Sequence, residues 1–141
     1  MKAFRARTVC WMAGVALAVG AFVAADAGTV AVKLTGDQEV PPVTTSAVGT
    51  GTITIKSDKT VTGTIKTVGI TGTMAHIHLA EPGKNGPAII TLEKSADGTW
   101  TVPAGSTLSD DQYASFLAGN LYVNVHSDAH KGGEIRTQLK P

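Results

Sequence analysis

Hydrophobic and polar residues alternate along most of this chain in short stretches, the pattern of half-buried β-strands. Gly, Pro, Asn and Asp residues separate the stretches, as is typical of turns. About seven or eight short antiparallel strands predict an all-β fold, either a Greek-key β-sandwich or a flattened barrel. The predicted strands are 29–35, 48–56, 60–68, 73–79, 88–93, 99–102, 121–126 and 134–139.

One segment has the pattern of a helix instead. Residues 109–112 read Ser-Asp-Asp-Gln, a capping box with acidic residues in the first turn, and Gly119 is a suitable stop. Tyr113, Phe116 and Leu117 are spaced to form one apolar stripe. The sequence therefore predicts one short helix that packs its stripe onto the sandwich.

The first 27 residues have the composition of a signal peptide. Three basic residues begin the segment, an apolar stretch follows over 9–23, and Ala25-Asp26-Ala27 fits a cleavage site that ends at Ala27. A membrane anchor is the alternative, although the uncharged run 8–25 is short for a membrane span. We therefore expect an exported protein, periplasmic or secreted, whose single domain covers 28–141.

Charge and cysteine content narrow the chemistry of this domain. The whole chain has a formal net charge of +1, and removal of the leader, with three basic residues and one acidic residue, changes it to −1. Electrostatic binding to nucleic acid is therefore not expected. The single cysteine, Cys10, lies in the leader, so a metal site in 28–141 must use histidine, carboxylate or carbonyl ligands.

Four histidines are the candidate metal ligands. In strand 73–79 the apolar set Ala75, Ile77 and Leu79 is expected to face the core, which turns His76 and His78 to the other face. In strand 121–126 the same argument turns His126 away from the core. If the strands are neighbours, these three imidazoles can share one ion. His130, on the following loop, is a candidate fourth ligand or a contact to a ligand.

All-nitrogen ligation suits copper, with zinc as the alternative. Met74 shares the predicted histidine face, and its thioether could serve Cu(I) or simply pack. Glu134 and Arg136 are expected on the same face of the last strand. They are candidates for contacts to the metal ligands or for attraction of a small anion, and the alternative is an exposed ion pair. The alternative for all four histidines is a polar surface without metal.

Three motifs in order resemble the CHRD (chordin-type) domain in its bacterial single-domain form. They are LTGDQEVPPV at 34–43, AHIH at 75–78 with GKNGP at 83–87, and YVNVHS at 122–127 with GEIRTQL at 133–139. Thr137 stands where the family usually has Gly, and Lys131 where Pro is common. The resemblance implies a secreted β-sandwich module; in animal chordins such domains accompany growth-factor binding.

A fainter resemblance is to copper/zinc superoxide dismutase, in which an H-x-H pair, a later copper-ligating histidine and a late arginine occur in the order of His76, His78, His126 and Arg136. The long loop with the zinc ligands and the two disulfide cysteines have no counterpart here. Three functions follow as hypotheses. The chain is a non-enzymatic copper-binding module for buffering or delivery, a protein-interaction or matrix module without metal, or a superoxide-dismutase-like copper enzyme.

Overall fold

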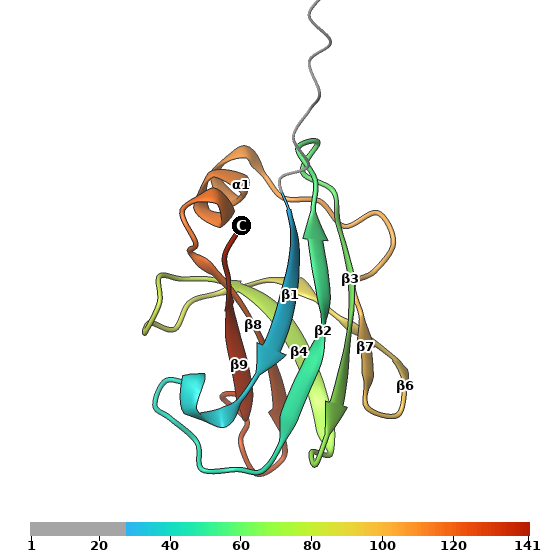
Figure 1. The fold of residues 1–141 in the computed structure, drawn as a ribbon, viewed down its shortest axis with the longest axis vertical. Helices are drawn as coiled ribbons and strands as arrows, with labels where there is room; N and C mark the ends of the chain where they lie inside the picture. Colours follow the sequence, from blue (N-terminus) through green and yellow to red (C-terminus); the bar gives the residue numbers. More distant parts are fainter. Residues whose placement is uncertain (1–27) are drawn as a thin grey trace, which may run out of the picture.

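The computed structural model describes residues 28–141, which form two antiparallel β-sheets packed face to face (Figure 1). One sheet contains β1 (Thr29–Leu34), β2 (Val48–Ile55), β3 (Val61–Val68), β6 (Glu93–Ala96) and β7 (Thr99–Thr101). The other contains β4 (Gly72–Leu79), β5 (Ala88–Thr91), β8 (Leu121–Ser127) and β9 (Ile135–Leu139). A 3-10 turn, η1 (Gly36–Gln38), and one helix, α1 (Asp110–Leu117), lie between strands.

The predicted fold class, an all-β sandwich with one short helix, is confirmed. The strand orders are β1-β2-β3-β7-β6 and β5-β4-β8-β9. The expected signal peptide, 1–27, lies outside the described residues. In the part of the chain that is described, no helix has the length and apolar character needed to cross a membrane.

The predicted strand 88–93 ends at Thr91 as β5, and a separate strand, β6, begins at Glu93, which corrects the expected topology. The chain first pairs with β4 as β5, and it then pairs with β7 in the opposite sheet as β6. Leu92, between them, is buried in the core, where its N–H donates to the carbonyl of Ala75. Alternation along the sequence shows that a segment is extended, but it does not specify which sheet each half joins.

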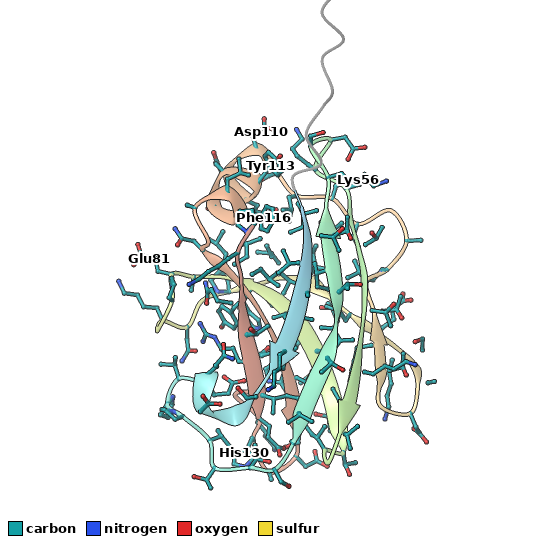
Figure 2. All side chains as sticks on the ribbon, viewed as in Figure 1. Lys56, Glu81, Asp110, Tyr113, Phe116 and His130 are labelled. Carbon is teal, nitrogen blue, oxygen red and sulfur yellow. The ribbon has the colours of Figure 1, made fainter. Side chains whose placement is uncertain are left out.

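The helix begins as predicted but buries only part of its stripe. The Ser109 hydroxyl accepts from the Gln112 N–H, and the Gln112 side chain accepts from the Ser109 N–H, which completes the capping box. Phe116 is fully buried on the side of α1 that faces the sandwich (Figure 2). Tyr113 packs partly against the core, whereas Leu117 is 51% exposed. The helix therefore contacts the sandwich with only part of its apolar stripe, mainly with Phe116.

The inner faces of the sheets form the core as the alternation predicted. Ala75 and Ile77 of β4 and Val123 of β8 are completely buried between the sheets. Part of the outer face of the four-stranded sheet is also buried, which the sequence did not predict: Tyr122 and Asn124 are almost inaccessible. Three connecting segments cover this face, namely 35–47, 80–87 and 127–134, through the contacts described below.

Candidate metal centre

The strands that carry the candidate ligands are neighbours in the sheet. β8 lies between β4 and β9, and both pairings are antiparallel. In the register of β4 and β8, His76 is opposite Asn124 and His78 is opposite Tyr122. This adjacency brings His76 and His78 of β4 to the same face as His126 of β8, as the alternation predicted.

The three imidazoles form one compact group. Each of His76, His78 and His126 offers one ring nitrogen, and these nitrogens lie within 4.8 Å of one another. The closest pair is Nδ1 of His76 and Nε2 of His126, which are 3.0 Å apart. The ring centroid of His76 lies 5.4 Å from that of His78 and 4.9 Å from that of His126.

Backbone carbonyls fix which nitrogen two of these rings present. Nδ1 of His78 lies 2.9 Å from the Gly86 carbonyl, and Nδ1 of His126 lies 2.8 Å from the Lys131 carbonyl. Because a carbonyl only accepts, both Nδ1 atoms carry the proton and both Nε2 atoms keep a lone pair. Ligating histidines in metalloproteins are commonly oriented by a contact of this kind to the second nitrogen.

One of these lone pairs has no partner in the protein. Nε2 of His78 is buried and makes no hydrogen bond. A buried polar atom without a partner has a cost in free energy, and functional sites are among its common explanations. The three rings therefore offer nitrogen lone pairs to the space between them. For at least one of these lone pairs, that of His78, the protein supplies no hydrogen-bond donor.

His76 and His78 are also kept in the neutral form that binds metal. Burial, then the nearby rings of His126 and His78, lower the pKa of His76 below its usual value. Burial is also the largest cause that lowers the pKa of His78, with the charges of His126 and Arg136 acting in the same direction. Neutral imidazole at neutral pH is the ligand form for a transition metal.

The size of the group suits one ion after a small closure. Zinc–nitrogen bonds of about 2.0–2.1 Å require nitrogen–nitrogen separations of about 3.3–3.6 Å in trigonal or tetrahedral geometry. The His76–His126 separation of 3.0 Å is already close to this value, whereas the full group reaches 4.8 Å. Rotation of one imidazole toward the other two would close the site.

His130, the predicted fourth ligand, is not a member of this group. It lies at the end of the sandwich opposite α1 (Figure 2) and lines a pocket of about 370 Å³ with Glu39, Asn85 and Gly133. Its backbone carbonyl and N–H instead close the turn with Ser127. The structure thus gathers three of the four histidines.

Arg136 does not form the expected exposed ion pair and does not face solvent. It is 2% exposed, and its guanidinium lies 3.4 Å from the centre of the Tyr122 ring. Its two terminal nitrogens donate to the Asn85 side chain and to the Lys84 carbonyl. Tyr122 in turn stacks in parallel on His78, with centroids 4.6 Å apart. Arg136 therefore reaches the candidate ligand His78 through Tyr122, with its guanidinium buried.

Glu134 is likewise a buried structural group. Its two carboxylate oxygens accept hydrogen bonds from the hydroxyls of Thr45 and Ser127. No ion pair joins Glu134 to Arg136 among the described residues. The first bond joins segment 35–47 to segment 127–134, and the second lies within segment 127–134.

A buried carboxyl group at Glu39 was missed in the sequence analysis. Burial raises the pKa of Glu39 above its usual value, while Arg136 and Asn124 act to lower it. Gly133, with φ of +128°, leaves room for this group, since a Cβ there would lie 2.4 Å from the Glu39 carboxyl and 2.5 Å from the Asn124 amide. Glu39 is in a polar, proline-containing loop, so its local sequence resembles an exposed turn.

The loop 81–86 does more than form a turn. Gly and Asn residues between strands are typical of turns, and Gly83 does have a positive φ of 77°. The loop in addition supplies the Gly86 carbonyl to His78, and the Asn85 side chain donates to the Val40 carbonyl. Backbone carbonyls have no residue-type signature, so only the folded chain reveals these contacts.

Comparison with known proteins identifies the family of this chain. The family model of the CHRD domain matches residues 30–139, which include every strand that carries the histidine group. No curated protein and no solved structure matches the chain. Residues 30–139 cover most of the 141-residue chain, and the chain therefore belongs to the CHRD domain family.

Proposed function

We propose that this chain is an exported, non-enzymatic module that binds a transition metal, copper, through His76, His78 and His126. The observation that carries the proposal is the fixed orientation of the rings. Two of them have Nδ1 bound to backbone carbonyls, at Gly86 and Lys131, and so turn Nε2 toward the shared space. Metal buffering or delivery is the role that we infer for such a site.

Copper is favoured by the donor set. The group offers three imidazole nitrogens, with no cysteine and no carboxylate among them. Nitrogen ligands suit copper and zinc, and copper(II) is bound most tightly of the common divalent ions by a given nitrogen site. Zinc is the alternative ion. Export is inferred from the leader in 1–27, whose pattern is that of a signal peptide.

Two other functions are less well supported. Superoxide-dismutase-like activity would need a cation that draws a small anion to the metal, and Arg136 is buried against Tyr122 with both terminal nitrogens engaged. A protein-interaction or matrix module without metal would leave the buried lone pair of His78 without a role. Metal analysis separates this second alternative from our proposal.

The first experiment is elemental analysis of protein purified from its exported compartment. We expect about one copper or zinc ion per chain, with copper in excess of zinc. Titration of metal-free protein with Cu(II) and with Zn(II) should give the same single site. Its affinity should fall as the pH decreases through the lowered pKa values of His76 and His78, because protons compete with the metal for these imidazoles.

Two variants test the ligand assignment. The double substitution His76→Ala and His78→Ala should abolish stoichiometric binding while circular dichroism shows an unchanged β-sheet fold. His130→Ala is the matched control, because His130 lies outside the group, and it should bind metal as the parent does. Protein that is metal-free as isolated and binds neither ion would refute the proposal and favour the interaction module.

A further inference from the structure

A methionine lies beside the histidine group on the same face of the sheet. Met74 is directly opposite His126 in the antiparallel register of β4 and β8. It precedes His76 by two residues, while Ala75 between them is buried in the core. Side chains directly opposite on antiparallel strands have Cβ atoms about 4.5–5.5 Å apart. The Met74 side chain therefore leaves the sheet beside that of His126, one of the closest pair of imidazoles.

Met74 is exposed where a large apolar side chain is usually covered. Its exposed fraction is 49%, and it is one of four large exposed apolar residues in the described part of the chain. His78, His126 and Tyr122 are nearly or completely buried. The solvent-accessible approach to the group is thus on the side of Met74 and the half-buried His76.

We propose that the sulfur of Met74 is the fourth ligand of the site and that it makes the site selective for Cu(I). This inference rests on the proposed metal-binding function. A thioether is a soft ligand that favours Cu(I) and contributes little to Zn(II) binding. The three rotatable bonds of methionine allow the sulfur to move from solvent onto an ion held by the imidazoles.

Met74 would also fill the fourth ligand position, for which His130 is not available. Three nitrogens leave a tetrahedral ion with one open position. His130 is outside the group, and Arg136 and Glu134 are engaged in other contacts. Met74 is an uncharged donor on the same face, and about half of its surface is exposed.

The test compares metal selectivity in two variants of the full chain. Both carry Cys10→Ser, which removes the only thiol, and one also carries Met74→Leu. Cu(I) affinity is measured anaerobically with ascorbate and a chromogenic Cu(I) chelator, and Zn(II) affinity with a zinc indicator. Loss of Met74 should weaken Cu(I) binding by about tenfold or more and change Zn(II) binding by less than about twofold.

A second readout observes the sulfur directly. The X-ray absorption spectrum of the Cu(I)-loaded Cys10→Ser protein should contain one sulfur scatterer, which Met74→Leu removes. Leu117→Ala is the matched control, because Leu117 is an equally exposed apolar residue on α1 and should leave both affinities unchanged.

The outcomes separate this inference from the proposed function. Tight Cu(I) binding without a sulfur scatterer, or with the same affinity after Met74→Leu, would overturn the role of Met74 and leave the three-histidine site intact. A chain that binds neither Cu(I) nor Zn(II) would refute the proposed function itself. Equal weakening of Cu(I) and Zn(II) binding in Met74→Leu would also overturn the selectivity, since a structural effect does not distinguish the two ions.

Discussion

Nδ1 of His76 lies 3.0 Å from Nε2 of His126, although the two residues are 50 positions apart in the chain. His126 Nδ1 donates to the Lys131 carbonyl, so its Nε2 accepts, and the proton between the two rings belongs to His76. A metal ion in the group would take the place of this proton.

The metal-free protein should lose stability as the pH falls below about 6.5. Burial is the main cause that lowers the pKa of both His76 and His78 in the folded chain. The unfolded chain therefore takes up protons at a higher pH than the folded chain. The free energy of unfolding should decrease from the unfolded pKa down to the lowered folded values. Urea unfolding across this pH range measures the effect.

A variant that removes both rings isolates their contribution. Glu39, whose pKa is raised mainly by burial, acts in the opposite direction, because its folded form binds a proton at a higher pH than its unfolded form. The double substitution His76→Gln and His78→Gln leaves Glu39 in place and should reduce the loss of stability on acidification. An unchanged pH dependence in this variant would contradict the prediction.

Replacement of Arg136 by Met should lower the free energy of unfolding by about 2–4 kcal/mol. The variant loses hydrogen bonds to the Asn85 side chain and the Lys84 carbonyl, and it loses the contact with Tyr122. It also removes the positive charge that lies near the buried Glu39. Chemical denaturation of both proteins at neutral pH gives the difference.

The control for Arg136 is an exposed ion pair in the same region. The Lys84 ammonium lies 3.1 Å from the Glu81 carboxylate, and both side chains are exposed. Lys84→Ala removes this pair, keeps the backbone carbonyl that Arg136 uses, and should change the stability by less than about 1 kcal/mol. If Arg136→Met also lowered the free energy of unfolding by less than about 1 kcal/mol, the buried contacts of Arg136 would contribute little to stability.

Gly133→Ala should destabilise the fold by about 1–3 kcal/mol, whereas Gly132→Ala should change it by less than about 0.5 kcal/mol. A Cβ at Gly133 meets the Glu39 carboxyl and the Asn124 amide at a positive φ of 128°, while a Cβ at Gly132 meets nothing within 4 Å. Thermal unfolding of the two variants side by side is the measurement. Similar melting temperatures would show that the Glu39 and Asn124 side chains adapt to the added methyl group.

Phe116→Ala should cost about 3–5 kcal/mol of stability, and Leu117→Ala less than about 0.5 kcal/mol. Phe116 is fully buried under α1, and Leu117 is 51% exposed, although the helical pattern assigns both to one stripe. Urea unfolding distinguishes them. A large effect at Leu117 would indicate that this residue is covered in solution.

Local patterns were sufficient to predict the sandwich and the orientation of the ligands. Period-two alternation separated Ala75 and Ile77 from His76 and His78, and the structure buries the first pair in the core. The capping box at Ser109 predicted the start of α1. These features depend on side chains that are near in sequence, so the chain sequence alone determines them.

Long-range contacts were decided only by the tertiary structure. The division of 88–93 between two sheets, the separation of His130 from the other histidines, and the burial of Arg136 against Tyr122 were not predicted. Each depends on loops that fold over the outer face of the four-stranded sheet and on backbone carbonyls such as that of Gly86. The sequence determined which way each strand residue points, because alternation is local. Which loop covers a residue, and which carbonyl meets its ring, depends on packing between distant segments.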